Sequence, residues 1–150
     1  MPASLSLKGR ALKYLAAREH SRSELLRKLA PHAQDANDIE QVLDELALKG
    51  FLSEERFVAS VVHRRAAGHG LARIRQELSL KGITADQMRE TLDALQPTEL
   101  ARAQAVWTRR FGTPATDLRE HGRQMRFLMA RGFSGEVVRR VLKGEGADVP

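Results

Sequence analysis

LARIRQELSLKGI, at residues 71–83, has the apolar spacing of an amphipathic helix that ends at a glycine. Leu71, Ile74 and Leu78 fall on one helical stripe because they are three and four residues apart. Gly82 stands where a helix C-terminus favours a left-handed residue, a conformation that glycine adopts without the steric cost of a Cβ atom. The stretch therefore predicts a helix that stops at a tight turn.

A second helix is expected directly after this turn. Thr84 and Gln87 have the spacing of a capping box, in which each side chain accepts a hydrogen bond from the other residue's backbone amide. Ile83 and Met88 flank the cap at the spacing of a hydrophobic staple. The two helices are thus predicted to form a helix–turn–helix pair with a single left-handed residue at its corner.

The same pattern returns about 50 residues later, where Gly132-Phe133-Ser134 matches Gly82-Ile83-Thr84. A leucine pair 14 residues apart accompanies each copy, and a third pair occurs upstream: Leu29 and Leu43, Leu78 and Leu92, Leu128 and Leu142. Internal repeats of this kind usually stack on one another to bury a continuous core. The chain is therefore expected to consist of three similar helical units.

Each repeat has room for one more helix in front of its pair. These leading helices are expected at about residues 5–18, from Ser53 onward, and after Pro97-Thr98. No segment shows sustained strand-like alternation. We therefore expect an all-α fold, an elongated, curved array of three tandem three-helix repeats. The expected boundaries are 1–51, 52–96 and 97–143, followed by a flexible tail at 144–150.

The composition narrows the chemistry and places the charge. The chain has 150 residues, no cysteine and a net charge of +6. Residues 101–150 carry 10 basic and 5 acidic side chains, against 8 and 7 in residues 1–50 and 7 and 7 in residues 51–100. An excess confined to the last third favours an acidic or phosphate-bearing partner. The missing cysteines exclude thiol chemistry and are compatible with the cytoplasm, and no apolar run is long enough for a membrane span.

No catalytic or metal-binding set converges in the sequence. The five histidines form no pair with metal-ligand spacing, and the carboxylates are scattered among arginines and lysines along predicted helices. Tyr14 and Trp107 lie on predicted inner faces, which leaves no platform for base stacking. We therefore expect a non-enzymatic protein without a metal or another cofactor.

The basic side chains are the candidate site. Those around the central turn and on the last two predicted helices are Arg64, Arg65, Arg73, Arg75, Arg119, Arg123, Arg126, Arg139, Arg140 and Lys143. They are either solvated helix faces that pair with neighbouring acids or a binding surface for acidic side chains or phosphates. The sequence leaves both interpretations open.

Two stretches resemble the RecX family of regulatory proteins. The first is Tyr14-Leu15-x-x-Arg18-x-x-Ser21-x-x-Glu24-Leu25-x-x-Lys28-Leu29, which is similar to the opening of that family. The second contains Glu55-Arg56-Phe57 and then Arg73-Ile74-x-x-Glu77-Leu78-x-x-Lys81-Gly82-Ile83, which is similar to its centre. The resemblance covers about residues 10–95 well and extends more weakly to about residue 143. His69-Gly70 differs, because the family commonly has a basic residue before this glycine.

The resemblance implies a non-enzymatic modulator of the RecA recombinase. Such proteins lie in the groove of the RecA–DNA filament and inhibit strand exchange and ATP hydrolysis, so the expected partner is that filament. A monomer is expected, and weak binding of single- or double-stranded DNA is a further expectation. The alternative is a DNA-binding regulator that uses its helix-turn-helix pairs. Against it, Asp86 and Glu136 place acids where a recognition helix should meet bases.

Overall fold

The computed structural model describes residues 4–145, which form nine α-helices and two short 3₁₀ helices and contain no strand. The α-helices are α1 (Leu7–Ala17), α2 (Arg22–Leu29), α3 (Ala36–Leu48), α4 (Glu54–Arg65), α5 (Leu71–Leu80), α6 (Ala85–Leu95), α7 (Glu99–Arg110), α8 (Leu118–Ala130) and α9 (Gly135–Leu142). The 3₁₀ helices are η1 (Ala30–His32) and η2 (Gln96–Thr98).

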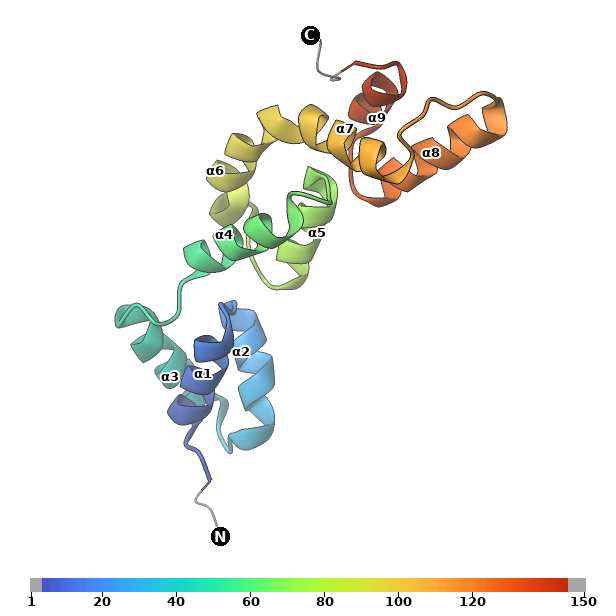
Figure 1. Cartoon of the computed structure of the whole chain (residues 1–150). Coiled ribbons are helices and arrows are strands. Elements are labelled where there is room, and N and C mark those ends of the chain that lie inside the picture. The colour runs from blue at the N-terminus through green and yellow to red at the C-terminus, as the bar shows by residue number, and fades with distance from the viewer. Residues whose placement is uncertain (1–3, 146–150) are drawn as a thin grey trace.

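Three groups of three helices follow one another along an elongated, bent molecule, with the first and third groups at opposite ends (Figure 1). Each group has its own cluster of buried apolar side chains, so the core consists of three small cores in a row. The expected all-α array of three tandem three-helix repeats is confirmed. Of the tail predicted at 144–150, residues 146–150 lie outside the described residues.

The helix ends are those that the sequence predicts. The predicted capping box of Thr84 and Gln87 is present, and a second one with the same spacing joins Ser21 and Glu24. Gly82 has a φ of 84°, and the amide of Ile83 donates to the carbonyl of Leu78 at 3.0 Å. The amide of Gly82 donates to the carbonyl of Ser79, and the two hydrogen bonds together form a Schellman motif that ends α5.

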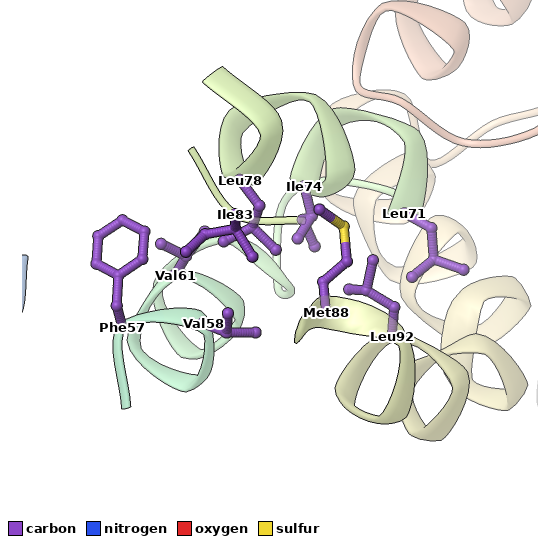
Figure 2. Packing of buried hydrophobic residues seen from close by; sticks show 9 residues of the cluster. All are labelled: Phe57, Val58, Val61, Leu71, Ile74, Leu78, Ile83, Met88 and Leu92. Carbon is purple, nitrogen blue, oxygen red and sulfur yellow. The ribbon is translucent and has the colours of Figure 1, made fainter. Parts of the chain in front are cut away.

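The central core shows how one repeat is held together. Nine buried apolar side chains from α4, α5 and α6 and the turn after α5 form its cluster: Phe57, Val58, Val61, Leu71, Ile74, Leu78, Ile83, Met88 and Leu92. Figure 2 shows Ile74 and Leu78 at its centre, with Phe57 and Leu71 on opposite sides in this view. The three residues of the opening helical stripe are thus all buried in one core.

Leu52 is buried in the core of the repeat that precedes it. The predicted boundary places this residue at the start of the second repeat, yet its side chain packs in the cluster of α1, α2 and α3. Its amide and that of Phe51 both donate to the carbonyl of Leu46, which turns the chain back over the end of α3. The first link between repeats contains no helix, whereas the second link contains the 3₁₀ helix η2.

The first and second repeats are joined mainly by polar contacts. Glu54, the first residue of α4, accepts a hydrogen bond from the amide of Arg22 at the start of α2, at 3.2 Å. Gly82 lies against Ser23, so close that a Cβ atom on the glycine would be 2.6 Å from the Cβ atom of the serine. Lys81 approaches the carboxylate of Glu24 at 3.4 Å across the same junction.

The second and third repeats are joined in the same way. Glu99, the first residue of α7, accepts a hydrogen bond from the amide of Leu71 at the start of α5, at 2.9 Å. Gly132 packs against Arg73, and a Cβ atom there would overlap the backbone of α5. Gly70 precedes α5 without a side chain, because the backbone of Gly132 occupies that space. Each later repeat therefore docks a glutamate and a turn glycine onto the second helix of the repeat before it.

We predict that alanine substitutions at three turn glycines lower the free energy of unfolding by different amounts. Gly50, Gly82 and Gly132 all have positive φ, but only Gly50 has open space where a Cβ atom would lie. Gly50→Ala should therefore lower the free energy of unfolding by about 1–2 kcal/mol through backbone strain alone. Gly82→Ala and Gly132→Ala should lower it further because they also open a junction between repeats. Urea denaturation of the three variants checks this order, and equal losses would show that the junctions are not close-packed.

Acid should weaken the first junction through Glu24. Burial raises the pKa of this carboxyl, but hydrogen bonds from Arg18 and from the Ser21 amide, with the charge of Lys81, lower the pKa to about 2. The folded pKa lies below the ordinary glutamate value of 4.5, so the ionised carboxylate stabilises the fold above that pH. The stabilisation is lost as the pH falls from about 4.5 towards about 2.

The measurement is the free energy of unfolding of Glu24→Gln as a function of pH. This variant should be less stable than the parent chain at neutral pH, and its stability should decline less steeply in the acid range. Parallel pH profiles for the two proteins would show that Glu24 does not carry the effect.

Candidate basic interaction surface

Helix α8 presents the densest group of candidate arginines, and a buried glutamine fixes its position. Gln124 accepts a hydrogen bond from the indole of Trp107 on α7 at 2.9 Å and donates one to the carbonyl of Thr113 at 3.2 Å. The Asp117 side chain caps the helix by accepting from the amide of Glu120. The buried side of α8 is thereby tied to α7 and to the loop between them, which leaves its outer side to solvent.

The outer side of α8 carries Arg119, Arg123 and Arg126, all exposed. Arg123 pairs with Glu120 at 3.1 Å. Within the part of the chain that the structure describes, Arg119 and Arg126 have no carboxylate within ion-pair distance. Positive charges without a nearby acid leave a stronger field at the surface than paired ones, because no counter-charge cancels them.

An aromatic pair lies between these arginines and the end of α7. The rings of Phe111 and Phe127 meet edge to face, with centroids 5.4 Å apart. Three guanidinium groups lie over the rings: Arg123 over Phe111 at 5.4 Å, Arg131 over Phe127 at 5.0 Å, and Arg110 over both rings at 5.6 and 5.3 Å. We call Arg110, Arg119, Arg123, Arg126 and Arg131, with the two phenylalanines, the third-repeat surface.

Sequence analysis missed four members of this surface. The candidates from the sequence do not include Arg110, Arg131, Phe111 or Phe127. The aromatic side chains that the sequence analysis assesses for base stacking are Tyr14 and Trp107. Those two side chains do pack against the cores of their repeats, as predicted. The spacing of four between Arg123, Phe127 and Arg131 was the available signal, since it places them along one side of a helix.

The candidates on α9 and α5 meet at the junction of the second and third repeats. Arg75 and Arg140 both line a cavity of about 740 Å³. This cavity also contains the acids Asp93, Glu99 and Glu136, so its charge is mixed. Arg140 pairs with Glu145 at 2.6 Å, whereas Arg139 and Lys143 are exposed on the last turn of the array. This group is therefore less uniformly positive than the third-repeat surface.

The central candidates are mostly engaged within the chain. Arg65 pairs with Glu77 at 3.0 Å, and that hydrogen bond raises the pKa of the guanidinium. Arg64 lies 4.0 Å from the same carboxylate. Arg73 packs against Gly132 and donates to the carbonyl of Ala130, so it helps to join two repeats. The ten candidates thus lie in three areas, on the outer side of α8, at the second junction and around α4 and α5, and Arg73 links the last two areas.

Among residues 4–145, no group of three or more histidine, aspartate or glutamate side chains has the geometry of a metal site. No described helix is long and apolar enough to cross a membrane. The described residues form three docked helical units with a basic outer surface on the third, which defines a helical-repeat protein.

Comparison with known proteins identifies the family. Residues 8–46, 53–92 and 98–142 match the first, second and third three-helix domains of RecX, respectively. Regulatory protein RecX of Leptothrix cholodnii is 69% identical over 139 residues, which cover 93% of this chain and 88% of that protein. Regulatory protein RecX of Ralstonia nicotianae is 52% identical, with 95% and 90% of the two chains covered. The chain belongs to the RecX family of regulatory proteins, which are not enzymes.

Two crystal structures share the fold. RecX from Lactobacillus salivarius superposes with a TM-score of 0.72 at 20% identity, covering 92% of this chain and 93% of that one. A second structure, of a regulatory protein RecX, gives a TM-score of 0.71 at 25% identity, covering 93% and 72%. The family matches confirm the resemblance stated from the sequence over all three repeats.

Proposed function

We propose that this protein binds the RecA nucleoprotein filament and inhibits its recombinase and ATPase activities, thereby modulating recombination and DNA repair. Membership of the RecX family is the observation that carries the proposal. The elongated, bent array supports it, because a long shape allows many weak contacts along a helical polymer (Figure 1). We further propose that the protein acts as a cytoplasmic monomer without a cofactor, with repeats at 1–51, 52–96 and 97–143, although the side chain of Leu52 packs in the core of the first repeat.

The third-repeat surface is the part that we propose to face the filament most directly. Its arginines are suited to carboxylates on RecA and to phosphates on the bound DNA, since guanidinium groups donate two parallel hydrogen bonds to either. Arg119 and Arg126 can bind without first breaking an ion pair recorded in the structure, which favours them over Arg65 and Arg140. We propose supporting contacts from Arg64, Arg75, Arg139 and Lys143.

The alternative, a helix-turn-helix DNA-binding regulator, is less well supported. A recognition helix enters the major groove with its N-terminal residues. The corresponding first turns of α6 and α9 carry the exposed acids Asp86 and Glu136, which would repel the phosphates that flank the groove. In addition, the turns at Gly82 and Gly132 are packed against the preceding repeat. Duplex DNA binding in the absence of RecA would favour this alternative.

The proposal predicts that this protein slows ATP hydrolysis by RecA on single-stranded DNA when it is titrated into the reaction. The triple variant Arg119→Gln, Arg123→Gln and Arg126→Gln should bind RecA–DNA filaments more weakly. Its salt dependence should also be flatter, by up to about three in the slope of log K against log salt if all three contact phosphates. Its stability should change little, because exposed charges contribute little to folding.

A matched control removes three charges elsewhere. Arg27, Lys49 and Arg89 are exposed and lie on α2, at the end of α3 and on α6, away from the third-repeat surface. Their triple change to Gln should leave filament affinity nearly unchanged. Equal losses for the two triple variants would show that only total charge matters and would remove the surface assignment. If the unmodified protein saturates the filament and the ATPase rate of RecA does not change, the proposed inhibition is wrong.

A further inference from the structure

The first repeat contains a cavity of about 460 Å³ that no part of the proposed function uses. Four basic side chains line it, Arg10 and Lys13 from α1, Arg18 just after α1, and Lys28 from α2. Among residues 4–145, no carboxylate lines it. Its volume lies in the range of small-molecule and side-chain binding sites, roughly 300–1,000 Å³. A concave site with only positive charges around it favours an anionic occupant.

The wall of this cavity is apolar between the charges. Leu5, Ala17 and the ring of Tyr14 contribute to the lining. Leu5 is about half exposed, at 48% of its full accessible surface, although it is a large apolar side chain next to a concavity. Burying such a surface under an apolar group is favourable by roughly 25 cal/mol for each Å² removed from water. The occupant is therefore expected to carry an apolar side chain as well as negative charge.

A buried histidine holds one of the lysines in place. The His20 side chain is 1% exposed, its Nδ1 atom is 3.0 Å from the carbonyl oxygen of Arg18, and its Nε2 atom is 2.8 Å from Nζ of Lys28. Burial lowers the pKa of His20, and the charges of Arg18 and Lys28 lower it further. The neutral ring can thus donate from Nδ1 and accept from Lys28 at Nε2.

Contacts with His20 and Tyr14 thus hold the Lys28 side chain in place, and no carboxylate of the described residues pairs with it. Its ammonium group lies 4.7 Å from the centroid of the Tyr14 ring and is hydrogen-bonded to His20. An ammonium group has three donors, so at least one remains for a ligand at the cavity wall. Of the four basic side chains, only Arg18 has an ion-pair partner in the described chain, Glu24 at 2.7 Å. Arg10, Lys13 and Lys28 are therefore available to carboxylates from outside.

The spacing of these charges distinguishes a peptide from a phosphate. The three available charges lie on two helices, with Arg10 and Lys13 on α1, roughly 4.5 Å apart along its axis, and Lys28 on α2. Charges divided between two helices suit carboxylates distributed along an extended peptide, which advances about 3.3 Å per residue. A phosphate is usually held by convergent donors that include free backbone amides. Here the lining residues of α1 lie within the helix, where amides are already bonded.

We propose that the cavity between α1 and α2 is a docking site for an acidic peptide segment, whose apolar side chain enters between Leu5, Tyr14 and Ala17 while its carboxylates contact Arg10, Lys13 and Lys28. The cavity lies in the first repeat, whereas the groups assigned to filament binding lie on the second and third repeats. Its occupation is therefore independent of the proposed function.

The test uses the full chain and a fluorescent probe peptide of about twelve residues, mostly glutamate and aspartate with one central phenylalanine. Fluorescence anisotropy should show saturable binding. Ala17→Glu places an acid on the cavity wall and should weaken binding by about fivefold or more, as should Lys28→Gln. The matched controls are Ala16→Glu and Arg27→Gln, which make the same changes at neighbouring exposed positions outside the lining. They should change affinity less than about twofold.

Further probes separate the alternatives. A peptide with alanine in place of the phenylalanine should bind more weakly, and a peptide with lysines in place of the acids should not bind. Circular dichroism of each variant confirms that it is folded. The proposal is overturned if the probe shows no saturable binding or if the controls lose as much affinity as the cavity variants. It is also overturned if ATP or a single-stranded oligonucleotide binds with the same variant pattern and displaces the peptide. Loss of peptide binding would leave RecA inhibition unaffected, so the two proposals fail separately.

Discussion

The close approach of a turn glycine to the second helix of the preceding repeat is the contact on which the array depends. A Cβ atom on Gly82 would lie 2.6 Å from that of Ser23, and one on Gly132 would overlap Arg73. At the second junction the constraint acts from both sides, because Gly70 also lacks the space for a side chain. Backbones that approach this closely have few alternative arrangements, so each junction fixes how two repeats sit.

The glutamates at the junctions make the contact directional. Glu54 and Glu99 each begin the first helix of a repeat and accept a hydrogen bond from the first amide of the second helix in the repeat before. The negative charge also lies at the positive end of that helix, where it is favourable. A glycine and a carboxylate, placed similarly in two successive repeats, impose a similar step along the array. Small rotations between successive repeats accumulate into the curvature of helical-repeat proteins. The basic groups on different repeats are thus held at fixed separations, which suits a partner that is itself a polymer.

The sequence predicts structural features that depend on residues close together in the chain. It does not predict contacts that depend on how helices and repeats pack against one another. The capping boxes, the left-handed Gly82 and the inner stripe of α5 follow from spacings within a few residues, and all are confirmed. The role of Arg73 could not be read in this way, because it packs against a glycine 59 positions further along the chain. The pairing of Phe111 with Phe127 also requires α7 and α8 to be placed side by side. Nothing in a single helical period contains that information.

The net charge of a segment does not predict the charge of its surface, because some charged side chains form ion pairs and others do not. The first 50 residues are almost neutral by count, with 8 basic and 7 acidic side chains. Their acids nevertheless gather on α3, where Glu45 pairs with Lys8 and Lys49, and Glu40 with Arg22. The charged side chains that line the cavity beside α1 are therefore all basic within the described part of the chain. In the third repeat the excess is real, yet Arg123 and Arg140 are paired while Arg119 and Arg126 are not. A strong local field therefore follows from which charges the fold leaves uncompensated, and the folded chain has such sites near both of its ends.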